Sequence, residues 1–130
     1  MASIRREFTV GMSAADAWDV IRDYGAVHTR LVPGFVTDTK LDGDARIVTF
    51  GNGSVVRERI VDLDDKRRRI AYSATGGRAE HHNATAEVFD GLETRIVWIT
   101  DVLPNEIAGY ITSQMDAAIP VMKKSLARTK

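Results

Sequence analysis

Residues 45–63 read ARIVTFGNGSVVRERIVDL, and this stretch decides the fold. Residues 45–50 and 54–63 are rich in β-branched residues and are bounded by turn residues, which is typical of β-strands. Gly51-Asn52-Gly53 separates the two segments, and Asn-Gly is a strong hairpin signal because both residues tolerate positive φ. The stretch therefore predicts two antiparallel strands joined by a short turn.

The same pattern continues on both sides of this hairpin. Further strands are predicted at residues 35–41, 68–75, 81–89 and 92–103, each bounded by turn residues such as Asp42-Gly43, Gly76-Gly77 and Asp90-Gly91. Six consecutive strands with short turns predict an antiparallel meander, because such turns are too short for parallel crossovers. Pro104 then ends the last strand.

The two ends of the chain carry different signals. Residues 3–10 alternate as a strand, and Ser13 stands three residues before Asp16, which predicts a capped helix through Arg22. A second short helix is expected at residues 26–31. A long helix is expected from Asn105, as its cap, to about Ala127, with one apolar stripe.

We expect these elements to form one α+β domain over residues 1–130 with a helix-grip architecture. A curved, seven-stranded antiparallel sheet must cover its apolar face, and the long C-terminal helix is the only element long enough to do so. Sheet twist separates the sheet from the helix at one side, so the wrap can leave a hollow.

Composition excludes several classes of protein. Eighteen basic side chains balance eighteen acidic ones, and there is no cysteine. Zero formal charge removes the long-range attraction to phosphate, and the lack of thiols excludes disulfides and cysteine-ligated metals. No apolar run approaches the roughly 20 residues of a membrane span. We expect a cytoplasmic monomer or homodimer with no cofactor, no nucleic-acid partner and no integral membrane association.

Three stretches resemble a known superfamily: residues 17–24 (AWDVIRDY), residues 53–65 with the core Val56-Arg57-Glu58-Arg59-Ile60, and Ile96-Val97-Trp98 with the later Pro104. The chain resembles, essentially end to end, START-like and Bet v 1-like (SRPBCC) proteins, in particular their polyketide cyclase/dehydrase and lipid-transport-like branch. Residues 53–77 also resemble plant abscisic-acid receptors. The resemblance implies a helix-grip fold and a small hydrophobic ligand in an internal cavity.

Strand parity indicates which residues line that hollow. If Glu58 points inward, Val56 and Ile60 do so as well, because they lie two positions away on the same strand. The last strand is apolar on both faces, so parity does not show which of its faces points inward. The resemblance favours Glu58, Tyr72, Ala84, Ala86 and Val97 as lining residues, with a gate-like turn at residues 50–53. The ligand-binding residues expected are Phe50, Val56, Glu58, Ile60, Tyr72, Ala74, His82, Ala84, Ala86, Val97, Ile99, Asp101, Ile111, Met115, Ala118 and Met122.

Glu58 is the one candidate catalytic residue. A carboxylate between Val56 and Ile60 on an inward face either orients a polar ligand group or acts as a general acid or base; alternatively, it pairs with a buried hydroxyl or an arginine for structure alone. His81 and His82 point to opposite faces of a strand and cannot chelate one ion, so no metal site is expected.

Three functions remain open on the sequence. Binding of a lipid, isoprenoid, polyketide or aromatic molecule is favoured, because acid–base chemistry often uses two titratable groups and only one strong inward candidate is present. The alternatives are a polyketide cyclase or dehydratase that uses Glu58, and a protein-interaction or co-chaperone module that uses the outer sheet face. Trp98 on that outer face would support the last alternative.

Overall fold

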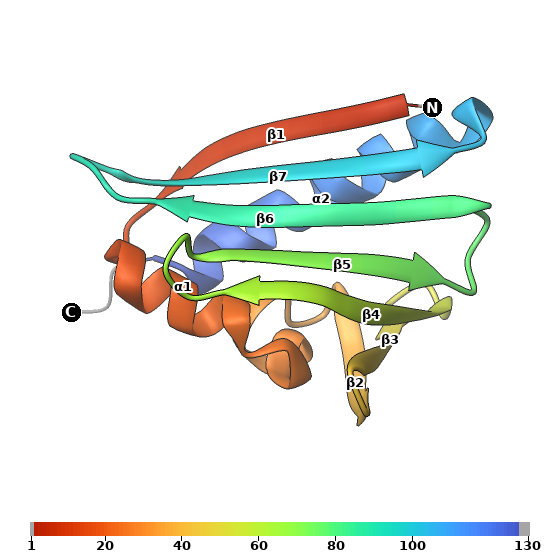
Figure 1. The fold of residues 1–130 in the computed structure, drawn as a ribbon, viewed down its shortest axis with the longest axis horizontal. Coiled ribbons are helices and arrows are strands. Elements are labelled where there is room, and N and C mark those ends of the chain that lie inside the picture. The colour runs from red at the N-terminus through yellow and green to blue at the C-terminus, as the bar shows by residue number, and fades with distance from the viewer. Residues whose placement is uncertain (1, 128–130) are drawn as a thin grey trace.

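The computed structural model describes residues 2–127. Its elements are β1 (Ala2–Val10), α1 (Ala14–Arg22), the 3-10 turn η1 (Tyr24–Ala26), the π-helical segment η2 (Val27–Leu31), β2 (Val36–Asp42), β3 (Ala45–Phe50), β4 (Val55–Asp64), β5 (Arg69–Thr75), β6 (His81–Phe89), β7 (Thr94–Leu103), the 3-10 turn η3 (Asn105–Ile107) and α2 (Ala108–Ser125) (Figure 1). This order confirms the predicted fold class.

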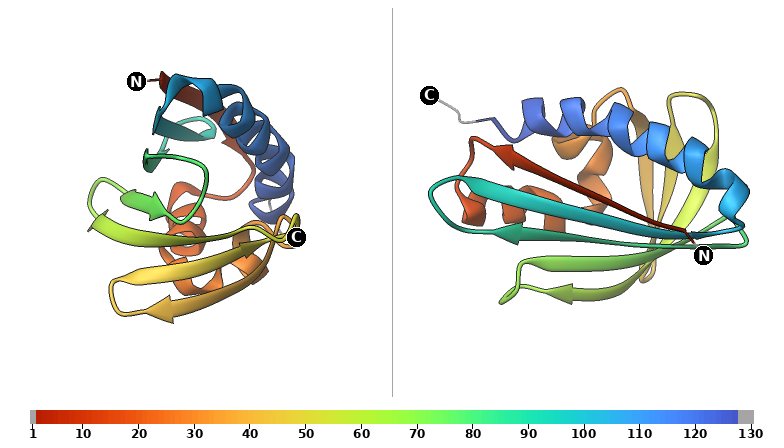
Figure 2. Two further views of the ribbon diagram at one scale, coloured as in Figure 1. Left: turned by 90° about the vertical axis from the view of Figure 1, so that its right-hand side faces the viewer. Right: turned by 90° about the horizontal axis from the view of Figure 1, so that it is seen from above.

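The strands form one seven-stranded sheet in the order β1-β7-β6-β5-β4-β3-β2, and every neighbouring pair is antiparallel. Figure 2 shows the sheet curling around α2, which runs along its concave side. A β-bulge in β4 contributes to the bend, because Ile60 pairs with Tyr72 and Asp62 with Ala71, which leaves Val61 without a partner. Val61 accordingly stays 66% exposed.

The predicted strands agree with the observed ones to within two residues, and two helical details differ. The second short helix is a 3-10 turn followed by a π-helical segment. The prediction that Asn105 caps the long helix is wrong, because the chain enters α2 through η3 and the N-cap Ile107 has no side-chain hydrogen bond. The backbone N–H of Ile107 instead bonds the carbonyl of Pro104 at 3.2 Å.

The core lies in two parts on the concave side of the sheet. The larger cluster joins α1 and η2 to the sheet and to the end of α2, and it includes Trp18, Leu31 and Leu126. The smaller cluster packs Met115 of α2 against the β1 and β7 end of the sheet. Between them α2 crosses the middle of the sheet, where the candidate site lies.

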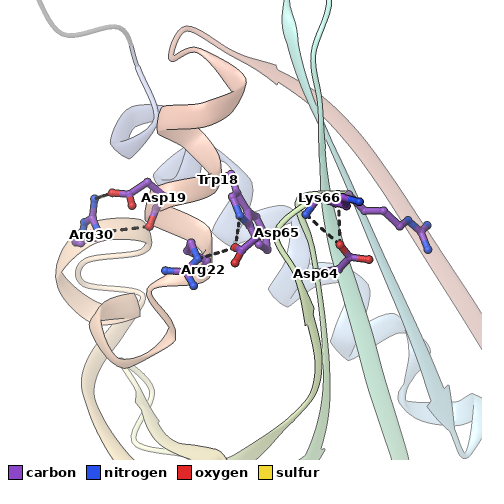
Figure 3. A network of polar contacts seen from close by, with 8 residues as sticks. Trp18, Asp19, Arg22, Arg30, Asp64, Asp65 and Lys66 are labelled. Atoms are coloured by element: carbon purple, nitrogen blue, oxygen red, sulfur yellow. Dashed lines mark hydrogen bonds and ion pairs between the residues drawn. The ribbon is translucent and has the colours of Figure 1, made fainter.

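Helix α1 is fixed to the turn between β4 and β5. The Ser13 hydroxyl accepts the Asp16 N–H at 3.2 Å, which confirms the predicted cap. Trp18 Nε1 and Arg22 Nε both donate to Asp65 Oδ1, at 2.9 and 2.8 Å (Figure 3). The Trp18 hydrogen bond, followed by that of Arg22, lowers the pKa of Asp65. These contacts hold α1 against the turn between β4 and β5.

Candidate ligand cavity

A cavity of about 210 Å³ lies between the sheet and α2. Residues from strands β2 to β7, from η2, from α2 and from the turns between them line it. Most of these are apolar: Val27, Leu31, Val32, Phe35, Val36, Val48, Phe50, Val56, Ala74, Ala79, Ile111, Met115, Ala118 and Met122. Ala74, Ala79 and Ala118 reach only a methyl group into the space, which helps to keep it from filling.

A buried ion pair forms the polar end of the cavity. Arg46 on β3 lies directly opposite Glu58 on β4, and Arg46 Nε donates to Glu58 Oε1 at 2.7 Å. The two side chains are only 7% and 11% exposed. Arg46 Nη1 also reaches the carbonyl oxygen of Tyr24 at 3.4 Å. Because both charges lie away from water, each depends on the other for compensation.

Two aromatic residues continue this polar row across the sheet. The Arg46 guanidinium carbon lies 5.1 Å from the centre of the Tyr72 ring, in the geometry of a cation–π contact. Trp98 Nε1 donates to the Tyr72 hydroxyl at 3.2 Å. Burial, followed by the negative charge of Glu58, raises the pKa of Tyr72 well above its usual range. Tyr72 therefore keeps its proton at neutral pH.

His82 adds a titratable group to the same wall. Burial lowers its pKa, the neighbouring His81 lowers it further, and Glu58 opposes both. Since an unperturbed histidine is already mostly neutral at pH 7, a lowered pKa leaves His82 neutral there. Arg46 and Glu58 together carry no net charge, so the inner part of the cavity is polar at one end and uncharged overall.

The cavity opens between the β3–β4 and β5–β6 turns, because its solvent-exposed lining residues are Ser54, Gly77 and Arg78. Tyr110 of α2 joins both turns: Asn52 Nδ2 donates to its hydroxyl at 3.4 Å, and the Arg78 guanidinium carbon lies 4.8 Å from its ring centre. The Phe35 and Phe50 rings meet edge to face nearby, 5.8 Å apart. Side chains from four segments therefore meet at the opening.

The structure places many of the predicted site residues in the cavity wall: Phe50, Val56, Glu58, Tyr72, Ala74, His82, Ile111, Met115, Ala118 and Met122. Ile60 and Ala84 lie on the same inner face of the sheet, opposite Tyr72 in register, but outside the lining. Ala86 lines a separate void of about 40 Å³ beside the main cavity. The ligand-binding role of these residues stays a prediction.

The prediction for the last strand is wrong. Trp98 and Thr100 line the cavity, whereas Val97, Ile99 and Asp101 lie on the opposite face of β7. Asp101 accepts hydrogen bonds from the Ser3 hydroxyl and, at 3.4 Å, from Asn83 Nδ2. Strand parity could not identify which face of β7 points into the cavity, because both faces carry apolar residues. The register of the folded sheet, in which Trp98 pairs with Ala86, identifies it.

Arg46 is the main residue that the sequence reasoning missed. The hairpin supplied a signal for it, because a turn centred on Asn52 pairs Thr49 with Val55 and therefore Arg46 with Glu58. A basic residue directly opposite a candidate buried acid is a cross-strand partner. Arg78 and Tyr110 carried no comparable signal, since their contact joins a loop to a helix.

Within residues 2–127, no group of three or more His, Cys, Asp or Glu side chains is placed to hold a metal ion. In the same part of the chain, none of the helices combines the length and the apolar character needed to cross a membrane.

The fold is similar to that of several solved structures. A protein from Thermobifida fusca shares 28% identity with a TM-score of 0.78, covering 97% of this chain and 91% of its own. A START superfamily protein from Mycobacterium smegmatis shares 12% identity, with a TM-score of 0.74 and coverage of 96% and 99%. Ara h 8.0201 shares 14% identity, with a TM-score of 0.75 and coverage of 96% and 97%. A comparison with curated protein sequences found no match.

These likenesses and the sheet wrapped around α2 show that the chain has a helix-grip fold. A family model described as polyketide cyclase / dehydrase and lipid transport matches residues 1–130. The chain belongs to that family, whose members typically bind hydrophobic ligands.

Proposed function

We propose that this protein binds one compact hydrophobic molecule in the cavity between its sheet and α2. The observation that carries the proposal is a cavity of about 210 Å³ with mainly apolar walls and a buried ion pair at one end. Apolar walls with a few fixed polar groups are typical of small-molecule sites.

The volume limits the ligand. An engineered apolar cavity of about 150 Å³ in another protein binds benzene, so about 210 Å³ suits one ring with a short substituent or a compact terpenoid skeleton. Candidate ligands are therefore small aromatic or isoprenoid molecules, or a short acyl chain, rather than a full phospholipid.

Pairing of Glu58 favours binding over the cyclase or dehydratase alternative. Arg46 Nε donates to Glu58 Oε1 at 2.7 Å between two buried side chains, so this carboxylate oxygen is already engaged in a structural ion pair rather than free to face a substrate. The interaction-module alternative depended on Trp98 facing outward, and Trp98 lies inside the cavity wall.

The test fills the cavity from one strand. Ala74 and Ala71 both lie on β5, but Ala74 lines the cavity and Ala71 does not. Ala74→Phe occupies the space, and Ala71→Phe adds the same ring outside it as a matched control. We expect acetophenone, titrated by calorimetry, to bind the wild type and Ala71→Phe but not Ala74→Phe. Equal binding to both variants would place the ligand elsewhere and reject the proposal.

A further inference from the structure

The Tyr72 hydroxyl has an unused proton. It accepts a hydrogen bond from Trp98 Nε1 at 3.2 Å, and no acceptor within residues 2–127 lies within hydrogen-bonding distance of its own O–H. The side chain lines the cavity, and burial keeps the hydroxyl protonated. A buried donor without an acceptor costs free energy, so an acceptor on a ligand in the cavity that Tyr72 lines would satisfy this proton.

Trp98 holds that hydroxyl from across an intervening strand. Tyr72 lies on β5 and Trp98 on β7, with β6 between them. The backbones of β5 and β7 are therefore roughly 10 Å apart, and the two side chains reach across β6 to make contact. Ala84 pairs with Tyr72, and Ala86 pairs with Trp98. These two residues of β6 carry only a methyl group, which leaves room for the contact above them. The indole N–H uses one lone pair of the hydroxyl oxygen and leaves the O–H to point elsewhere.

A second unused donor belongs to Arg46, whose side chain stacks over the Tyr72 ring and also lines the cavity. Arg46 uses Nε and Nη1, while its Nη2 has no hydrogen-bond partner among the described residues. The charge of Arg46 is already balanced by Glu58 at 2.7 Å. Two donors at an electrically neutral site match an oxygen that accepts two hydrogen bonds, donates none and carries no charge. A carbonyl oxygen has these properties, whereas a carboxylate would bring an unbalanced charge into the cavity.

We propose that the ligand carries an uncharged carbonyl group, as in a ketone, aldehyde or ester, whose oxygen accepts the Tyr72 O–H. Arg46 Nη2 is the second donor, and Trp98 is a positioning residue that fixes the Tyr72 hydroxyl. This inference rests on the proposed binding function and names its ligand class.

The experiment compares two ligands of the same shape by isothermal titration calorimetry. Acetophenone carries a carbonyl oxygen where α-methylstyrene carries a CH₂ group, and both suit the cavity. We expect the wild type to bind acetophenone on the order of tenfold more tightly, since the ketone satisfies donors that the alkene leaves unpaired. Tyr72→Phe, which keeps the ring over Arg46, should remove most of that preference and leave the affinity for α-methylstyrene within about twofold.

Trp98→Phe separates positioning from direct contact. It leaves the Tyr72 hydroxyl in place but free to turn, so we expect a smaller preference for the ketone and little change for the alkene. Equal affinity of the wild type for both ligands overturns the carbonyl inference and leaves cavity binding intact. Failure of the wild type to bind either compound overturns both proposals. The wild-type comparison decides the carbonyl inference even if Tyr72→Phe does not fold.

Discussion

At the scale of single residues, the ion pair of Arg46 and Glu58 should matter more for stability than any exposed ion pair. Glu58→Gln leaves the guanidinium buried without its counter-charge, and breaking such a pair typically costs 3–5 kcal/mol. We expect the free energy of unfolding to fall by about 3 kcal/mol, measured by urea denaturation.

The sheet offers a matched control for this prediction. Arg59 on the adjacent strand position pairs with Asp44 at 3.0 Å, with both side chains more than half exposed. Asp44→Asn should cost less than about 1 kcal/mol, because water screens this pair and solvates the remaining charge. Similar losses in the two variants would mean that water reaches the Glu58 site.

At the scale of elements, the path of the chain at the cavity mouth depends on one glycine. A Cβ on Gly51 would lie 2.8 Å from the carbonyl oxygen of Gly34, and the Gly51 N–H bonds the Phe35 carbonyl at 2.9 Å. Gly51→Ala must push the β3–β4 turn away from the segment before β2. Phe50, next to the turn, and Phe35, in that segment, both line the cavity. We expect a loss of about 1–2 kcal/mol in the free energy of unfolding.

Gly109 provides the comparison for this substitution. It lies in α2, and a Cβ there would meet no atom within 4 Å. Gly109→Ala should stabilise the protein by about 0.5 kcal/mol, because alanine favours the helix and nothing has to move. Thermal or urea denaturation of the two variants should give shifts of opposite sign, and a neutral Gly51→Ala would show that the turn relaxes freely.

The elements themselves were largely predictable because local physics specifies them. Residues 3–10 alternate with a period of two, the other strands are rich in β-branched residues, and turn residues such as Asp42-Gly43, Gly51-Asn52-Gly53 and Asp90-Gly91 mark where strands end. The facing of β7 was not predictable, since Val97 and Ile99 are as apolar as Ile96 and Trp98. The hairpin register could have revealed Arg46, whereas Arg78 and Tyr110 meet only in the folded chain.

At the scale of the whole molecule, the cavity links folding to pH through His82. Burial lowers the pKa of His82 in the folded state below the ordinary value of 6.5 that it regains on unfolding. As the pH falls below about 6.5, His82 binds a proton in the unfolded chain but stays neutral in the folded protein. Above about pH 6.5, His82 therefore does not reduce the free energy of unfolding. Below that pH the free energy of unfolding decreases, and this decrease ends once the pH lies below the folded-state pKa of His82.

His82→Gln removes this contribution, because glutamine stays neutral at every pH. We expect the free energy of unfolding of the wild type to decline between pH 7 and pH 5, and that of the variant to decline less over the same interval. Urea denaturation at half-unit steps measures the difference curve, in which carboxylate groups common to both proteins cancel. If the two proteins decline in parallel, His82 is solvated in the folded state, and the cavity wall at this position is open to water rather than closed.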